Sequence, residues 1–155
     1  MKKKTVTGKR IAIVLLVLVI AAQLIPVDFE NPSIRPENDF ITHTVPSELI
    51  ADNIKSACYD CHSFESKSPW YARIAPASWL MKAHIDEGRE HLNFSNWTSY
   101  QPKEQIHILE ECVEEMTNNE MPLSSYTLIH GKLTGEQKIQ VIEFFNQTIK
   151  TIDPE

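Results

Sequence analysis

The apolar residues of this chain form one continuous run near the N-terminus and several helix-like stripes further along. The first ten residues carry five basic side chains and no acidic one, and residues 11–27 are apolar apart from Gln23. A basic segment followed by an apolar run is typical of a signal peptide or a membrane anchor. Seventeen residues is the lower limit for crossing a bilayer, and no clear small-residue cleavage site follows. We therefore expect a transmembrane signal anchor at 11–27 rather than a cleaved signal peptide, with residues 1–10 in the cytoplasm.

The segment after this run lacks a regular apolar pattern. Residues 28–44 contain Pro32 and Pro36 among mostly polar residues, so we expect an extended tether. Residues 45–155 are then the folded domain.

Four helices are predicted in that domain, because apolar residues recur there at intervals of three and four. They begin near Pro46, near Pro76, after Pro102 and at Thr134, and Gln137 completes a capping box with Thr134. Gly88 is expected to weaken the second helix. The expected apolar faces consist of Leu49, Ile50, Ile54, Ala57 and Cys61; Trp79, Leu80, Ala83 and His84; Ile106, Leu109, Val113 and Met116; and Ile139, Ile142, Phe145 and Ile149. No alternating strand pattern is convincing beyond Val45, which predicts an all-α fold.

The charge is distributed unevenly between the two parts of the chain. The whole chain carries −6, whereas residues 28–155 contain ten basic and twenty-one acidic side chains, a net charge of −11. A domain this acidic would be repelled by nucleic acid and would favour a partner with a basic docking surface. The alternative is that the acidity only keeps the domain soluble.

The pentapeptide Cys58-Tyr59-Asp60-Cys61-His62 is the strongest chemical signal in the sequence. On one helical turn, residues at i, i+3 and i+4 share a face, and Cys58, Cys61 and His62 occupy these positions. Two thiols on one face can each add to a vinyl group of one porphyrin, and the adjacent imidazole can approach the iron as proximal ligand. The spacing therefore predicts a single covalently bound c-type haem.

Other roles for the cysteines have less support. Zinc would need further ligands, such as Cys112 or a histidine, but no second Cys-x-x-Cys or paired-histidine motif is present. A thioredoxin-like redox pair would need a preceding strand, which is not predicted. An inert buried pair is the remaining alternative, and we interpret Cys112 as a small buried apolar residue.

Met121 is the first candidate for the sixth iron ligand. It lies in the turn-rich loop 118–123, just before Pro122, where helix packing does not dictate its direction. The alternative for a lone methionine is core packing. His84 ranks second, and the remaining rivals are His91, His107, His130, Met81 and Met116. Trp70 and Trp79 are candidates to line the porphyrin, as are Trp97 and Tyr71, and Arg73 could pair with a propionate; ordinary core or surface roles are the alternatives.

Several segments together resemble the bacterial haem-binding-domain family of c-type cytochromes. They are ACYDCHS (57–63), PWYARIAP (69–76), GREHLNFS (88–95) and EMPL (120–123). The resemblance covers about residues 45–150. It implies a monohaem, all-α, cytochrome c-like domain with His62 as proximal ligand and Met121 as distal ligand.

The combined expectation is a single-electron carrier rather than an enzyme. The haem domain would lie in the periplasm, held on the bacterial cytoplasmic membrane by the single-pass anchor, and would exchange electrons with a redox protein. A haem-based gas sensor or peroxidase-like enzyme is the alternative, and it requires an open distal site. A zinc-stabilised interaction module is the third possibility.

Overall fold

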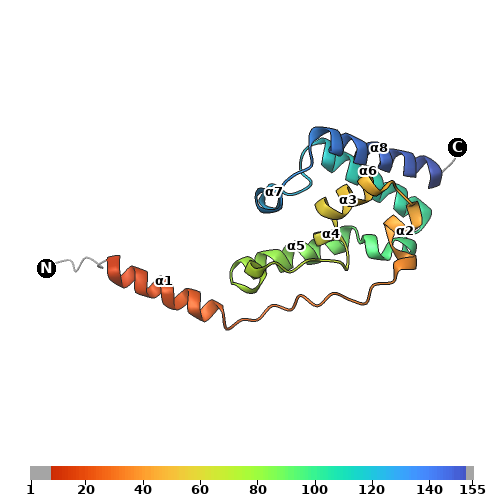
Figure 1. Cartoon of the computed structure of the whole chain (residues 1–155). Helices are drawn as coiled ribbons and strands as arrows, with labels where there is room; N and C mark the ends of the chain where they lie inside the picture. The colour runs from red at the N-terminus through yellow and green to blue at the C-terminus, as the bar shows by residue number, and fades with distance from the viewer. Residues whose placement is uncertain (1–7, 153–155) are drawn as a thin grey trace. The chain divides into compact units, whose positions relative to one another are not determined.

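The computed structural model describes residues 8–152 and has helices but no strand in that range, so the all-α prediction is confirmed (Figure 1). The elements are α1 (Gly8–Ala22), η1 (Pro36–Asn38), α2 (Phe40–Thr44), α3 (Glu48–Ala57), α4 (Tyr59–His62), η2 (Trp70–Arg73), α5 (Ala77–His91), η3 (Phe94–Ser99), α6 (Pro102–Thr117), α7 (Ser124–His130) and α8 (Gly135–Ile152), where η denotes a 3₁₀ helix.

The chain divides into two compact units. One unit comprises residues 1–30 with 68–84, and the other comprises residues 31–67 with 85–155. Helix α5 supplies residues to both units, since its residues up to His84 belong to the first and those from Ile85 to the second.

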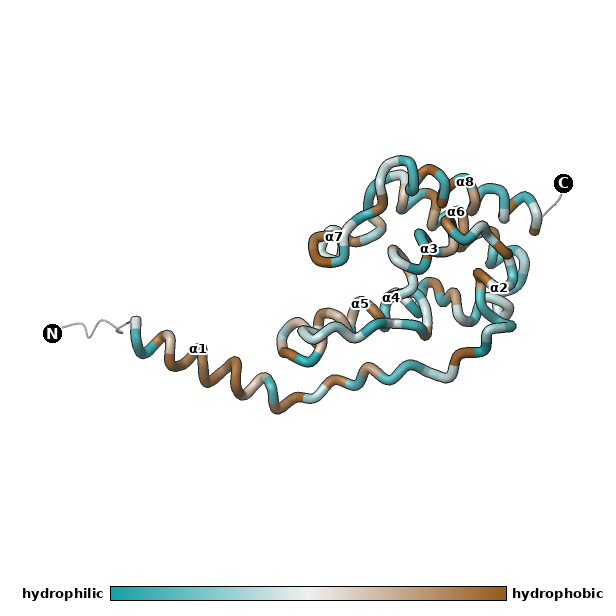
Figure 2. Tube along the Cα trace, in the orientation of Figure 1, coloured by the Kyte–Doolittle hydropathy of each residue, from teal (hydrophilic) through white to brown (hydrophobic). Residues whose placement is uncertain are grey.

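In the first unit, α1 is an apolar helix of 15 residues (Figure 2). Within residues 8–152, no helix has both the length and the apolar character needed to cross a membrane. The predicted transmembrane anchor at 11–27 therefore has no support from the structure. Gln23 is the polar residue that interrupts the apolar run at 11–27. It makes two hydrogen bonds with Ala75: its amide donates to the backbone carbonyl at 3.1 Å and accepts from the backbone N–H at 3.0 Å.

The core of the second unit is aromatic. Phe40 is fully buried, with its ring 5.0 Å from Phe94 and 4.9 Å from Trp97, and Tyr59 stacks on Phe94 at 5.2 Å. Helices α6 and α8 pack side by side beside this cluster (Figure 1). Trp97 is therefore a core residue, and its role at the haem stays a prediction.

The segment 28–44 differs from the predicted extended tether in its second half. Residues 36–44 form η1 and α2, and the Asp39 carboxylate caps α2 by accepting the Ile41 N–H at 2.9 Å. The burial of Phe40 explains the difference, because a single large aromatic side chain fixes a helix too short to show a period.

The four predicted helices correspond to α3, α5, α6 and α8, with some corrections at individual positions. Helix α5 continues through Gly88 to His91 instead of weakening there. Leu49 and Ile139, which were expected to be buried, are 55% and 57% exposed. The capping box at the start of α8 is confirmed by hydrogen bonds of 2.9 and 3.2 Å between Thr134 and Gln137.

Candidate haem site

The cysteine motif forms the junction of two helices. Cys58 ends α3 and opens α4, and the Cys61 and His62 amides both bond back to the Cys58 carbonyl, at 3.2 and 2.9 Å. The predicted helical turn is therefore present. The cysteines are free thiols and partly buried, and burial raises the pKa of Cys58 to about 12. Burial also raises the pKa of Cys61, so both thiols are protonated at neutral pH.

The His62 imidazole is held by backbone carbonyls in the last turn of α5 and just after it. Its Nδ1 lies 2.9 Å from the Gly88 carbonyl and 3.2 Å from the Leu92 carbonyl. Because a carbonyl oxygen only accepts hydrogen bonds, Nδ1 carries the proton and Nε2 is left with its lone pair. Burial lowers the pKa of His62, which favours this neutral form. A neutral imidazole fixed through one nitrogen, with the other nitrogen available, is the usual arrangement of a metal-ligating histidine.

Gly88 allows the close approach that this arrangement needs. A Cβ atom at this position would lie 3.0 Å from the Cys61 carbonyl oxygen and 3.3 Å from the Cys61 Cβ. The obstacle is largely backbone, so it could not move aside without shifting α4. Gly88 therefore brings its own carbonyl within reach of His62 by letting α5 contact α4.

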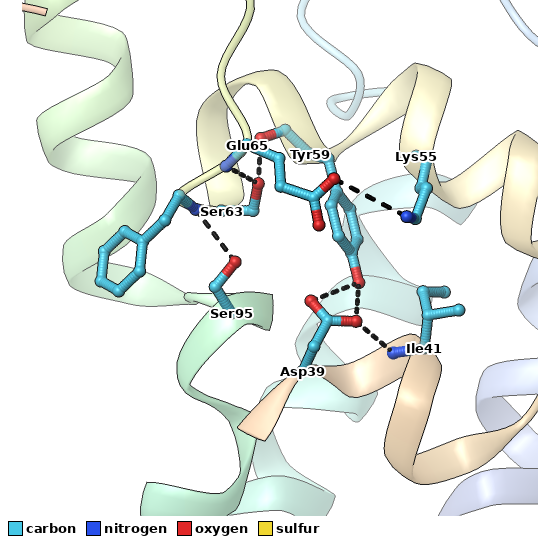
Figure 3. A network of polar contacts seen from close by, with 8 residues as sticks. Asp39, Ile41, Lys55, Tyr59, Ser63, Glu65 and Ser95 are labelled. Atoms are coloured by element: carbon cyan, nitrogen blue, oxygen red, sulfur yellow. Dashed lines mark hydrogen bonds and ion pairs between the residues drawn. The ribbon is translucent and has the colours of Figure 1, made fainter. Parts of the chain in front are cut away.

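A polar network holds the motif and the residues after it (Figure 3). The buried Tyr59 hydroxyl lies 3.1 and 3.2 Å from the two carboxylate oxygens of Asp39. The Ser63 hydroxyl donates to the Tyr59 carbonyl and accepts the Glu65 N–H, both at 2.8 Å. The chain direction on both sides of Cys61 and His62 is thereby fixed.

Arg89 secures the segment that follows the motif. Its Nε donates to the Ser63 carbonyl at 2.8 Å, and its Nη2 donates to the Ser66 hydroxyl at 3.0 Å and to the Asn31 side chain at 2.6 Å. The guanidinium also lies 5.3 Å from the centre of the Phe64 ring. One side chain of α5 thus ties residues 63–66 to the helix that orients His62.

Met121 is partly buried in the loop between α6 and α7. Its N–H donates to the Glu115 carbonyl at 3.2 Å, which anchors the loop to the end of α6. Pro122 and Ala57 line one cleft of about 160 Å³. This volume is below the roughly 300–1,000 Å³ of most ligand pockets, so the cleft alone does not hold a porphyrin. It does show that the Met121 loop borders the same space as the residue before Cys58.

The comparison with protein families agrees with this geometry. A haem-binding domain family matches residues 17–147, which is most of the chain. The chain belongs to the haem-binding domain family. Neither the comparison with curated proteins nor that with solved structures gave a match.

The residues of this haem-binding domain fit a haem group. Cys58, at the start of α4, and Cys61, within it, stand one helical turn apart, and His62 presents an unprotonated Nε2. By contrast, no group of three or more His, Cys, Asp or Glu side chains in residues 8–152 is placed to hold a metal ion. The zinc alternative therefore lacks a ligand set in the part of the chain that the structure describes.

The other predicted site residues are distributed over both units. Trp70, Arg73 and Trp79 belong to the first unit, where Trp70 is 77% and Trp79 is 37% exposed, and their role at the haem stays a prediction. The remaining candidate ligands are His84 on α5, partly buried; His91, exposed at the end of α5; His107, 3.4 Å from Glu111; His130, stacked on Tyr126; Met81, partly buried; and Met116, buried in the core.

The sequence analysis did not predict the roles of three residues of the haem-binding domain. Gly88 and Leu92 orient His62 through their carbonyls, and Arg89 binds the following loop. A glycine inside an otherwise helical pattern was the available signal for Gly88, since such a residue often marks a close approach. Backbone carbonyls leave no signal in a sequence, so the role of Leu92 could not be found that way.

Proposed function

We propose that this haem-binding domain carries one covalently attached c-type haem and transfers single electrons. The thiols of Cys58 and Cys61 would each add across a vinyl group: the S–H bond and the vinyl π bond break, one carbon–sulfur and one carbon–hydrogen bond form, and no external oxidant is needed. The bound haem supplies an iron that alternates between ferrous and ferric.

The observation that carries this proposal is the setting of His62. Its Nδ1 proton points to the Gly88 and Leu92 carbonyls, and it directly follows the second of two cysteines on one helical turn. A histidine used only for packing or as a surface base does not need a fixed tautomer. An axial iron ligand needs an unprotonated nitrogen facing the iron, and covalent attachment of the haem needs two thiols nearby.

We assign Met121 as the sixth ligand. It lies on a loop, partly buried, and its neighbour Pro122 borders the cleft that Ala57 also lines. A thioether ligand stabilises ferrous iron and raises the reduction potential, which suits an electron carrier. The candidate histidines on α6 and α7 are exposed, and His107 already pairs with Glu111.

We further propose that residues 28–155 work outside the cytoplasmic membrane. The basic segment and apolar run at 1–27 are an export signal in either interpretation, as anchor or as signal peptide. The charge of −11 on residues 28–155 favours a redox partner with a basic docking surface. Fractionation of cells producing the full chain distinguishes anchor from signal peptide, because only an anchored chain resists extraction from membranes.

The absorption spectrum of the full chain, produced in a periplasm with haem-attachment machinery, tests the proposed function. We expect a low-spin c-type spectrum, with a thioether-to-iron band in the oxidised form that Met121→Ala removes. A high-spin spectrum would contradict the six-coordinate assignment and favour gas binding or peroxidase-like chemistry. A spectrum and potential unchanged by Met121→Ala would show that another residue is the sixth ligand.

A further inference from the structure

Tyr126 connects the helix after the Met121 loop directly to the cysteine motif. Its hydroxyl lies 2.7 Å from Oδ2 of Asp60 and 2.9 Å from the Ser56 carbonyl. Asp60 stands between Cys58 and Cys61 in the sequence, and Ser56 closely precedes Cys58. A hydroxyl has one hydrogen, and the shorter distance, to the carboxylate, is the geometry of a charge-assisted hydrogen bond.

Helix α7 is only shallowly packed. None of its residues is buried, and Leu128 and Ile129 are 85% and 63% exposed. A helix of seven residues is not stable by itself in water, so its position depends on its tertiary contacts. Tyr126 is partly buried and also stacks on His130, with the ring centroids 4.3 Å apart.

The Met121 loop is therefore secured at both ends, but by different elements. Upstream, the Glu120 and Met121 amides donate to the Glu115 carbonyl, and Lys138 of α8 donates to the Asn119 side chain at 2.8 Å. These contacts tie the loop to α6 and α8. Downstream, Tyr126 ties it to the segment that bears the haem-attaching cysteines.

We propose that Tyr126 is a positioning residue for the sixth ligand. Its hydrogen bond to Asp60 keeps the Met121 loop in a fixed position next to the turn that carries Cys58 and Cys61. It thereby holds the Met121 thioether in place against competing ligands. This inference rests on the proposed function, since it requires Met121 to be an iron ligand. It goes beyond that function by assigning the stability of the distal bond to a hydroxyl five residues away.

Imidazole binding to the ferric full-chain holoprotein tests the inference, followed through the loss of the thioether-to-iron band. Tyr126→Phe removes one oxygen atom and leaves the ring on His130. We expect its apparent imidazole affinity to rise about tenfold, because a charge-assisted hydrogen bond no longer opposes release of the loop.

Matched variants separate positioning from general stability. Thr98→Val removes a hydroxyl elsewhere in the same unit, where it donates to the Asn38 side chain at 3.0 Å, and should leave imidazole affinity unchanged. Asp60→Ala removes the acceptor, and the double variant with Tyr126→Phe should bind imidazole no more tightly than either single variant.

The outcomes distinguish the inference from the function on which it rests. If the wild-type holoprotein has the thioether band but Tyr126→Phe and Thr98→Val bind imidazole equally, Tyr126 has no positioning role and the proposed function stands. If the two single variants act additively, the Tyr126–Asp60 bond is not the cause. If the wild-type protein lacks the band, both the Met121 assignment and this inference are wrong.

Discussion

At the scale of single residues, the site depends on contacts that set the direction of His62. The Gly88 and Leu92 carbonyls determine which nitrogen carries the proton, and the absence of a Cβ at Gly88 permits the approach of α5. The spacing of Cys58, Cys61 and His62 is enough to predict His62 as the proposed ligand. Its orientation could not be predicted, because that comes from backbone atoms more than twenty-five residues away in the sequence.

Replacing Gly88 by Ala tests this contact. Alanine would favour the helix by about 1 kcal/mol, but its Cβ would meet Cys61 backbone atoms at 3.0 and 3.3 Å, and such overpacking costs about 1–3 kcal/mol. We expect a net loss in the free energy of unfolding and less haem incorporated per chain. Gly135→Ala is the control, since nothing lies within 4 Å of its Cβ. Equal behaviour of the two variants in urea unfolding would contradict the tight contact.

Asp39 is a second residue whose role comes from burial. It is 4% exposed, caps α2 and accepts the Tyr59 hydroxyl. Asp39→Ala removes the cap and leaves the Tyr59 hydroxyl buried without a partner, so the free energy of unfolding should fall by about 2–4 kcal/mol. Asp39→Asn keeps an acceptor and should lose less. Chemical denaturation of both variants checks the order, and equal losses would show that the carboxylate charge, rather than the hydrogen-bond acceptor, is the essential feature.

The same carboxyl group predicts a pH dependence. Burial raises the pKa of Asp39 above its ordinary value of 3.8, so the folded protein binds this proton more tightly than the unfolded chain does. The resulting stability is complete below pH 3.8 and is lost as pH rises through the raised pKa. Compared with Asp39→Asn at each pH, the wild type should therefore become relatively less stable from acid towards neutral pH. A constant difference would show that the burial has no such effect.

At the scale of elements, the helices that could be predicted are those whose apolar residues recur over several turns or that begin near a proline or a capping box. Helices α3, α5, α6 and α8 begin near the prolines or the capping box that predicted them. Helices α2 and α7 have five and seven residues, too few to display a period. Phe40 and Tyr126 fix these two helices through contacts with distant parts of the chain, and a sequence pattern does not report such contacts.

The start of α8 offers a test at this scale. Thr134 and Gln137 exchange two hydrogen bonds there, and α8 packs on both α3 and α6. Thr134→Ala should therefore lower the free energy of unfolding of the whole unit by about 1 kcal/mol. Thr151→Ala is a control near the other end of α8, where the hydroxyl bonds only its own helix at Gln147. If both variants have the same denaturation midpoint, the capping box contributes nothing measurable.

At the scale of the whole molecule, the net charge governs association more than folding. With −11 on residues 28–155, electron exchange with a basic redox protein should be steered electrostatically. Raising the ionic strength from about 0.01 M to about 0.1 M shortens the screening length from about 30 to about 10 Å. The bimolecular rate measured by stopped flow should therefore fall steeply over this range, whereas an acidic redox protein should react faster as salt increases. A rate independent of salt with both partners would contradict the docking proposal.

Covalent haem attachment at the cysteine motif is the central claim, and the intact mass of the full chain in denaturing solvent tests it most directly. After production with haem-attachment machinery, the wild-type mass should exceed that of the polypeptide by one haem. Cys58→Ala with Cys61→Ala should abolish this increase, and Cys112→Ala should leave it unchanged. A wild-type chain that has the mass of the bare polypeptide, with any haem released by the solvent, would contradict covalent attachment.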